Sequence, residues 1–336
     1  MRLSNAEVKS IARRIDLRPL DGSRILITGA TGMVGSYMTE ALCRTLDLQG
    51  IRPREILAMS RTNSRSAIHY LLKYEYLNLG EFESIKDQSI CADFVVHAAS
   101  PASPTKYTSR DDLRHVNAET LRYLINSKGQ RIVFLSSGEV YGSDTPELIP
   151  EEYQGNIQTN SHRSIYPIAK LEGERVGREL ASKYNSDFRI ARLFHTFGPG
   201  LKSNDGRSFG DFLWSAAGGW KPHLKSLGTD VRTFLYLEDT IVAILLLLLS
   251  EQPPDILNIG SEIPISILDF ARRVSFLSGH GQKVSFADSN EQSAPSPNSS
   301  IIPDTTKLQA LGWRQEIDLD ESVSRTLKWI RNRSNE

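Results

Sequence analysis

Apolar residues in the first half of the chain occur in short continuous runs, and segments with helical spacing lie between them. Such runs are typical of buried strands in a parallel sheet, whereas apolar residues three and four apart indicate helices. We predict strands in four runs: "RILITGA" (24–30), "EILAMSR" (55–61), "ADFVVHAAS" (92–100) and "QRIVFLSSG" (130–138). We predict helices in three segments: "MVGSYMTEALCRTL" (33–46), "SAIHYLLKYEYL" (66–77) and "LRHVNAETLRYLINS" (113–127).

The alternation continues through the middle of the chain. "YPIAKLEGERVGRELASKY" (166–184) predicts a helix and "FRIARLF" (188–194) a further strand. Repeated strand–helix units predict an α/β fold with a doubly wound parallel sheet, in which ligands bind at the carboxyl ends of the strands. The N-terminal "MRLSNAEVKSIARRIDL" (1–17) predicts a short amphipathic helix outside the first strand, and "IVAILLLLL" (241–249) predicts a buried helix.

Composition narrows the classes of partner. Forty basic and forty acidic side chains cancel, so the net charge favours neither nucleic acid nor an anionic membrane. Two cysteines, Cys43 and Cys91, are too few for a disulfide framework, and we expect both in the core. The longest apolar run is far shorter than the ~20 residues that span a bilayer, and the N-terminal segment lacks a signal peptide's apolar stretch. We therefore expect a cytoplasmic protein that binds no nucleic acid and no membrane.

A glycine-rich loop joins the first strand to the first long helix. "TGATGMVG" (28–35) places Gly29, Gly32 and Gly35 at three-residue intervals. Glycines let the backbone turn sharply and approach a pyrophosphate, and the helix N-terminus offers free N–H groups. In the first unit of an alternating chain this spacing predicts a dinucleotide site.

Two later segments carry candidate chemistry. "YPIAK" places Tyr166 and Lys170 four residues apart, on one face of a helix, where an ammonium group would favour the tyrosine phenolate. "LSSGEVYG" (135–142) ends a strand in two hydroxyls, a glycine and Glu139. In isolation the first pattern is common and the second is an ordinary strand end. In this order with the glycine loop, they indicate an active site.

This set of motifs resembles the extended branch of the short-chain dehydrogenase/reductase (epimerase/dehydratase) superfamily, whose members act on nucleotide-activated sugars. Within it, the chain from residue 24 onward is most similar to UDP-glucuronate decarboxylases, through "AASPASPTKY" (98–107), "RIARLFHTFGPGLKSNDGRSFGDFL" (189–213), "VRTFLYLEDT" (231–240) and "PDTTKLQALGW" (303–313). The resemblance implies an N-terminal helical extension (1–23), a Rossmann-type dinucleotide-binding domain (24–197) and a smaller substrate lobe (198–336) with segments that return to the main sheet. It also implies a homodimer.

The resemblance also implies site residues. Catalysis falls to Ser137, Glu139, Tyr166 and Lys170. Bound NAD or NADP is contacted by Gly29, Thr31, Gly32, Met33, Val34, Gly35, Ser60, Arg61, Ala98, Ala99, Ser100, Asn117, Ser136, Tyr166 and Lys170. The nucleotide sugar is contacted by Pro101, Tyr107, His195, Arg207 and Arg232, and no metal is implied.

The implied reaction begins with transient oxidation at sugar carbon 4, which makes a carbon 5 carboxylate part of a β-keto acid. Departures from the family leave other reactions open. Gly138 stands where dehydratases carry an acid, and His195 stands where the decarboxylases usually carry Asn. Alternatives are therefore 4-epimerisation, 4,6-dehydration, and a non-catalytic dinucleotide sensor or scaffold. Strand 55–61 ends in Ser60 and Arg61, not in the acidic residue usual for NAD, so NADP is slightly favoured.

Overall fold

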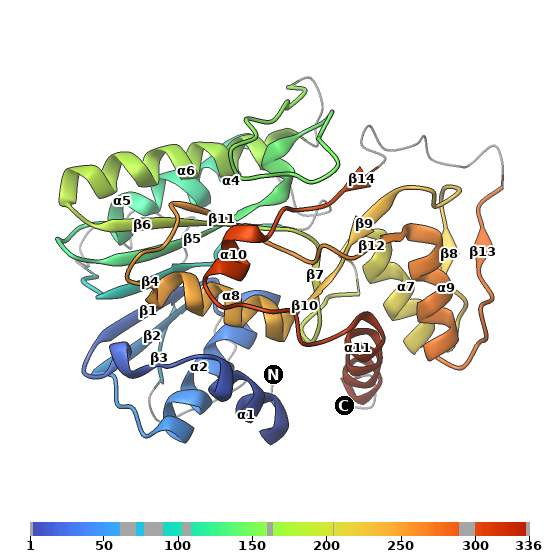
Figure 1. The fold of residues 1–336 in the computed structure, drawn as a ribbon, viewed down its shortest axis with the longest axis horizontal. Helices are drawn as coiled ribbons and strands as arrows, with labels where there is room; N and C mark the ends of the chain where they lie inside the picture. Colours follow the sequence, from blue (N-terminus) through green and yellow to red (C-terminus); the bar gives the residue numbers. More distant parts are fainter. Residues whose placement is uncertain are drawn as a thin grey trace.

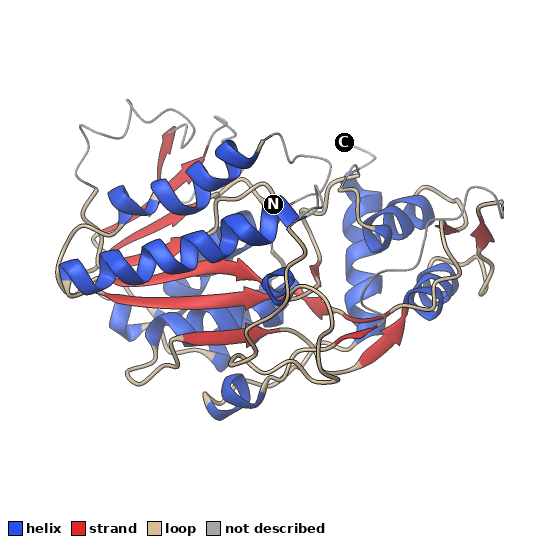
Figure 2. Cartoon of the chain, turned by 90° about the horizontal axis from the view of Figure 1, so that it is seen from above, coloured by secondary structure: helices blue, strands red, loops and turns tan. Residues whose placement is uncertain are grey.

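The central element is a seven-stranded parallel sheet (Figures 1 and 2). We describe a computed structural model in which residues 3–60, 72–76, 90–102, 109–159, 164–203, 205–288 and 300–333 are placed, with the backbone alone considered for 72–76. The strand order is β11-β6-β5-β4-β1-β2-β3, and every neighbouring pair is parallel. The strands are β1 (Arg24–Thr28), β2 (Glu55–Ser60), β3 (Leu72–Tyr76), β4 (Phe94–His97), β5 (Arg131–Ser137), β6 (Asp187–Leu193) and β11 (Ile256–Ile259). The predicted fold class is confirmed.

Helices cover both faces of this sheet. One face carries α1 (Asn5–Arg14), α2 (Met33–Gln49) and α8 (Leu237–Leu249). The other carries α4 (Arg110–Arg114), a π-helical turn (His115–Glu119), α5 (Leu121–Leu124) and α6 (Ile165–Tyr184). Each face has its own apolar core, because inward side chains of a strand alternate between the two sides. The run at 241–249 is buried in α8, as predicted.

One predicted helix is wrong in its second half. We expected a helix over 66–77, but Leu72–Tyr76 forms strand β3, which pairs in parallel with β2 from Leu72 opposite Ile56 to Tyr76 opposite Ser60. The sequence "LKYEY" alternates apolar and polar residues and carries two tyrosines, which suits an edge strand. As a strand, this segment forms hydrogen bonds with the edge of β2, which a helix over the same residues could not form.

The C-terminal part of the chain builds a smaller lobe beside the carboxyl ends of the strands (Figure 1). Its helices are α7 (Ser208–Ala217), α9 (Ile267–Leu277) and α11 (Leu319–Arg333). Its strands are β8 (His223–Leu224), β9 (Val231–Thr233), β12 (Pro264–Ser266), β13 (Ser285–Phe286) and β14 (Ser300–Ile301). Phe197, Phe209, Phe234 and Phe270 pack edge to face or stacked in its core. The linkers are β7 (Thr196–Phe197), β10 (Leu235–Tyr236) and α10 (Thr306–Ala310).

Buried ion pairs connect the N-terminal helix α1 to helix α8. Arg14 lies 2.7 Å from Asp239 and 3.9 Å from Glu238, both at the first turn of α8, and Arg325 of α11 contacts Glu238 at 2.8 Å. Both carboxylates lie in the first turn of α8 and are fully buried. Burial raises the pKa of both carboxyl groups, and the two arginines oppose that shift.

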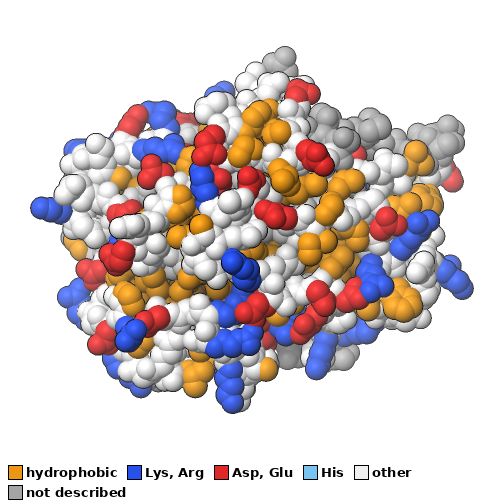
Figure 3. Space-filling view, in the orientation of Figure 1, with side chains coloured by type: hydrophobic (Ala, Val, Ile, Leu, Met, Phe, Trp, Pro, Cys, Tyr) orange, Lys and Arg blue, Asp and Glu red, His pale blue; other side chains and the backbone are white. Residues whose placement is uncertain are grey.

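Two further expectations concern the surface. Cys43 is buried as predicted, but Cys91 is exposed, because it precedes the start of β4. On the face drawn in Figure 3, acidic and basic side chains are interspersed, consistent with the cancelling charges. Within the described ranges, no helix is both long and apolar enough to cross a bilayer.

Candidate active site

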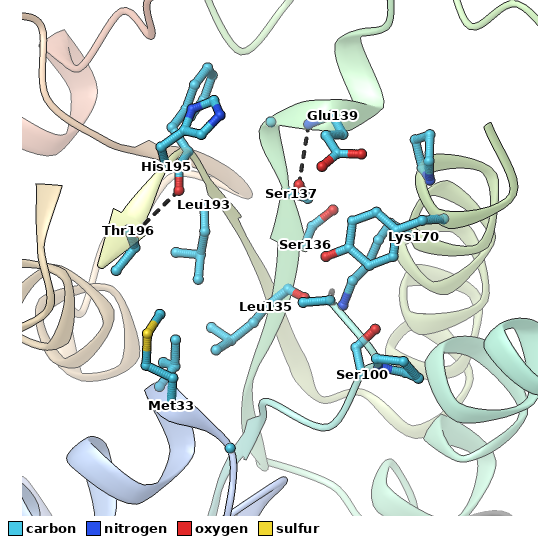
Figure 4. A pocket seen from close by; sticks show the side chains of 18 of the residues that line it. Met33, Ser100, Leu135, Ser136, Ser137, Glu139, Lys170, Leu193, His195 and Thr196 are labelled. Carbon is cyan, nitrogen blue, oxygen red and sulfur yellow. Dashed lines mark hydrogen bonds between the residues drawn. The ribbon is translucent and has the colours of Figure 1, made fainter. Parts of the chain in front are cut away.

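A cavity of about 570 Å³ opens where the carboxyl ends of β1, β2, β4, β5 and β6 face the smaller lobe. Ligands of doubly wound sheets bind at this edge. Most of the predicted site residues line it (Figure 4 shows several). They are Gly29, Thr31, Gly32, Met33, Val34, Gly35, Ser60, Ala98, Ala99, Ser100, Pro101, Ser136, Ser137, Glu139, Tyr166, Lys170, His195 and Arg207. Positions up to 178 residues apart in sequence are thereby brought to one cavity.

The glycine loop is built by close backbone approach. Gly29 has a left-handed φ of 68°, and a Cβ there would lie 2.7 Å from backbone atoms of Ala98 and Ala99. A Cβ on Gly35 would lie 2.2 Å from the carbonyl oxygen of Gly29. Helix α2 begins directly after Gly32, which has no side chain to cap the first N–H groups. The loop therefore leaves backbone donors and a helix N-terminus facing the cavity, which suits a phosphate group.

A buried histidine is hydrogen-bonded to the end of the strand that leads into this loop. His97 Nδ1 lies 2.7 Å from Thr28 Oγ1, and His97 Nε2 lies 3.0 Å from the carbonyl oxygen of Val116. Thr28 Oγ1 also accepts from the N–H of Ala99 at 3.2 Å. Burial lowers the pKa of His97 to about 3, with a smaller effect from Lys170, so the ring is neutral. The sequence analysis missed this residue, although a histidine at the end of a buried strand was visible in "FVVHAAS".

Tyr166, Ser137 and Lys170 meet on the opposite wall. The Ser137 hydroxyl lies close enough to Tyr166 to lower the pKa of that phenol, and the Lys170 ammonium donates to the carbonyl oxygen of Leu135 at 2.6 Å. Burial lowers the pKa of Lys170 to about 7. We expected Lys170 to lower the pKa of Tyr166. Instead, burial and then the Glu139 carboxylate raise the pKa of Tyr166, and Ser137 and Arg207 oppose that shift. The Lys170 nitrogen lies 5.7 Å from the tyrosine ring centroid.

Glu139 and Gly138 follow Ser137 in a short 3₁₀ turn (Gly138–Tyr141). The Glu139 N–H donates to Ser137 Oγ at 3.2 Å, and the Glu139 side chain is exposed at the cavity rim (Figure 4). A Cβ on Gly138 would lie 3.0 Å from the ring of Phe194, which also lines the cavity. Phe194 thus occupies the volume that a side chain at position 138 would need.

The substrate-side wall carries His195 and a pair of charges. Burial, then Arg232 and Arg207, lower the pKa of His195 to about 3, and its Nδ1 has no hydrogen-bond partner among the placed residues. Figure 4 shows His195 across the cavity from Ser137. Arg207 pairs with Asp205, with Arg207 Nη2 donating to Asp205 Oδ1 at 2.9 Å.

Two described site residues do not line the cavity, and two more lie outside the described residues. Arg232 is buried on β9, 3.5 Å from Asp230. Asn117 is fully buried in the π-helical turn and donates to the Leu113 carbonyl oxygen. The other two, Arg61 and Tyr107, lie outside the described residues. The sequence analysis also missed lining residues on loops without a motif, such as Lys202, Thr145 and Gln158.

Comparison with known proteins agrees with this geometry. A model of the NAD dependent epimerase/dehydratase family matches residues 25–260. The chain belongs to this family. It is 31% identical over 324 residues to UDP-glucuronic acid decarboxylase 1 of Xenopus tropicalis, covering 93% of this chain and 73% of that protein. The resemblance drawn from the motifs is therefore confirmed.

Solved structures of family members share the fold. A UDP-glucose 4-epimerase of Thermotoga maritima, solved with UDP-glucose, superposes with a TM-score of 0.78 at 19% identity, covering 93% of this chain and 99% of that one. MoeE5 in complex with UDP-glucuronic acid and NAD superposes with a TM-score of 0.74 at 21% identity, covering 92% and 99%. At identities this low, the similarity supports a shared fold and nothing more.

Proposed function

We propose that this family member decarboxylates UDP-glucuronate through transient oxidation at sugar carbon 4. The observation that carries the proposal is the meeting of the Ser137–Tyr166 hydroxyl pair and Lys170 with the glycine loop in one cavity. The relatives named UDP-glucuronic acid decarboxylase support the choice of substrate.

The cavity fits a dinucleotide on the evidence of its backbone. At Gly29 and Gly35 any added Cβ meets backbone within 2.7 Å, so the loop is as close to β4 and α2 as glycine allows. Thr31, Gly32, Met33 and the following N–H groups would hold the pyrophosphate, and Lys170 with Tyr166 would hold the ribose next to the nicotinamide. When bound, NAD would supply a hydride acceptor in its oxidised form and a hydride donor in its reduced form.

Tyr166 takes the central role in proton transfer. Its phenolate accepts the proton of the sugar 4-hydroxyl, and Ser137 donates a hydrogen bond to the same oxygen. Because burial and Glu139 raise the pKa of Tyr166, the Lys170 ammonium is needed to favour the phenolate once a ligand excludes water. The 4-ketone then withdraws the electron pair of the breaking carbon 5–carboxylate bond, and protonated Tyr166 and Ser137 stabilise the resulting enolate oxygen. A proton from solvent at carbon 5 regenerates the 4-ketone, and Tyr166 returns its proton to the carbon 4 oxygen when that ketone is reduced.

The other charged residues manage the substrate's anions. Arg207 lies close enough to Tyr166 and Glu139 to interact with both electrostatically, so it is placed to hold the diphosphate or the carboxylate. Glu139 lies at the rim beside Ser137, where its negative charge would disfavour the substrate carboxylate and promote its loss as neutral carbon dioxide. Neutral His195 contributes a ring nitrogen as a hydrogen-bonding group.

Product analysis tests the proposal. The purified protein is incubated with NAD and, in separate reactions, UDP-glucuronate and UDP-glucose, and the products are measured by mass spectrometry. Loss of carbon dioxide from UDP-glucuronate supports decarboxylation. An unchanged mass with a new 4-epimer, loss of water from UDP-glucose, or no reaction with any nucleotide sugar would instead support epimerisation, dehydration or a non-catalytic role.

Three finer proposals accompany the function. Ser60 lines the cavity at the end of β2, and Arg61 follows it, so we infer a slight preference for NADP over NAD. Calorimetric titration with both cofactors tests this preference, and tighter binding of NAD contradicts it.

From the family resemblance we also infer a homodimer, measured by light scattering, and a cytoplasmic location, measured by cell fractionation.

A further inference from the structure

A buried carboxylate lies directly behind the cavity wall. Glu174 of α6 is 1% exposed, and its Oε1 accepts from the Ser136 hydroxyl at 2.6 Å. Arg192 of β6 donates to the same carboxylate through Nε at 3.0 Å and Nη2 at 2.7 Å. Both carboxylate oxygens of Glu174 therefore accept hydrogen bonds, and the carboxylate is fixed relative to two strands and one helix.

Glu174 follows Lys170 by four residues, so the two side chains lie on the same face of α6, one turn apart. Lys170 is 2% exposed and donates to the Leu135 carbonyl oxygen, directly before Ser136. An ammonium at such a depth loses hydration, which favours its neutral form. A negative charge one turn away on the same face compensates for that loss.

We propose that Glu174 is a positioning residue for the reaction: its carboxylate holds the Ser136 hydroxyl at the cavity wall and keeps the Lys170 side chain in its ammonium form. The inference rests on the proposed function only for the role of Lys170 in that reaction. Electrostatics agree with the geometry, because burial lowers the pKa of Lys170 to about 7 and Glu174 opposes that shift.

Other ionisable groups also face Lys170. Tyr166 of α6 lies with its ring centroid 5.7 Å from the Lys170 nitrogen. His97 of β4 is neutral, since burial lowers its pKa to about 3. β5 presents the Phe134 ring at 4.9 Å and the Ser136 hydroxyl, and Arg192 of β6 lies beyond Glu174. Among these groups, Glu174 is the one whose negative charge raises the pKa of Lys170.

The test is the variant Glu174→Gln, which keeps the shape and removes the charge. The titration of the Lys170 side chain is followed by NMR of ¹³C-labelled lysine, assigned by Lys170→Arg, in the protein with NAD. We expect the Lys170 midpoint to fall by about one pH unit, and the alkaline limb of the kcat/KM profile to move by the same amount. On that limb the rate falls about tenfold.

A matched control is available on the same helix. Glu179 pairs with Arg175 at the exposed surface of α6, so Glu179→Gln makes the same chemical change away from the cavity. We expect the Lys170 midpoint of that variant to equal that of the unmodified protein. Glu174→Asp keeps the charge and should restore the midpoint. If Glu174→Gln does not fold, Glu174→Gln/Arg192→Met removes both charges at similar volume and should show the same direction.

The outcomes separate the two proposals. A Lys170 midpoint that moves no further in Glu174→Gln than in Glu179→Gln, or activity lost equally at every pH, overturns the role of Glu174. A shifted midpoint in a protein that releases no carbon dioxide from UDP-glucuronate leaves the role of Glu174 intact and overturns the proposed function.

Discussion

The two walls of the cavity are built by different means. The cofactor-side wall consists mainly of backbone, where Gly29 and Gly35 let β1, α2 and the loop after β4 touch. The rest of the lining includes side chains such as Glu139, His195 and Arg207, and the Nδ1 of His195 has no hydrogen-bond partner among the described residues. A backbone cradle accepts one kind of ligand and tolerates no added atom, whereas a wall of side chains is changed one residue at a time. The chemistry and the specificity of the protein are therefore expected to depend on the second wall.

The largest effect is expected at Tyr166. Tyr166→Phe removes the proton acceptor and leaves the glycine loop untouched, so turnover should fall by about 10³-fold, within the range of general acid–base catalysis. NAD should still bind, as measured by calorimetry, with at most about a tenfold loss of affinity for the missing hydroxyl contact, because the glycine loop that would hold the pyrophosphate is unchanged. Turnover within about tenfold of the unmodified protein would remove Tyr166 from the mechanism.

One added methyl group should disrupt the glycine loop. Gly35→Ala places a Cβ 2.2 Å from the Gly29 carbonyl oxygen, so the loop must open, and NAD should bind about 100-fold more weakly. The control is Gly218→Ala in the lobe, where the added Cβ meets its nearest atom at 3.4 Å and NAD affinity should not change. Equal NAD affinities in both variants, again measured by calorimetry, would contradict a backbone-built wall.

Glu139 tests the part of the cavity that is built from side chains, because its carboxylate should affect the loss of carbon dioxide and not the preceding oxidation. Glu139→Gln preserves the shape and removes the charge, so bound cofactor should still be reduced on meeting UDP-glucuronate, while carbon dioxide release slows by about 10- to 100-fold. Rapid-mixing absorbance of the reduced nicotinamide, recorded beside carbon dioxide release, separates the two steps. Release at the normal rate would assign Glu139 a structural role.

The smallest effect is expected at His195. His195→Asn keeps a hydrogen-bonding group but shortens it, so KM for the nucleotide sugar should rise about tenfold with NAD affinity unchanged. Because the folded pKa of about 3 lies far below the ordinary value, His195 stays neutral at physiological pH. The KM of the unmodified protein should therefore show no inflection between about pH 5 and about pH 8 from this residue. An inflection near pH 6.5 that His195→Asn abolishes would show that the ring titrates.

The features predicted correctly from the sequence are those that depend on the spacing of residues along a single element. The helical interval between Tyr166 and Lys170 and the glycine spacing each fix neighbouring positions on one element, and both sets line the cavity. The parallel sheet followed from the repeated units in the same way. Helix formation over 72–76 was wrong, since that choice depended on the edge of a strand formed elsewhere in the chain.

Features that need two distant segments were out of reach of the sequence. The contact between Gly138 and Phe194 joins β5 to the end of β6, and Glu174 meets Ser136 and Arg192 from three elements. No local pattern distinguishes such a buried glutamate from the exposed Glu179 on the same helix. Burial, which decides the charge state of each ionisable group, appears only when the elements are packed.

The ion pairs between Arg14, Glu238 and Asp239 bear on how this chain can be divided. A gene fragment limited to the family match, 25–260, would keep both carboxylates and discard Arg14 together with Arg325. Each buried charge that loses its partner costs about 3–5 kcal/mol, a large share of the ~5–15 kcal/mol that holds a typical domain folded. We therefore expect the stretch 25–260 not to fold as an independent unit. Chimeras that exchange specificity with other family members should carry the first helix and the last one along with it.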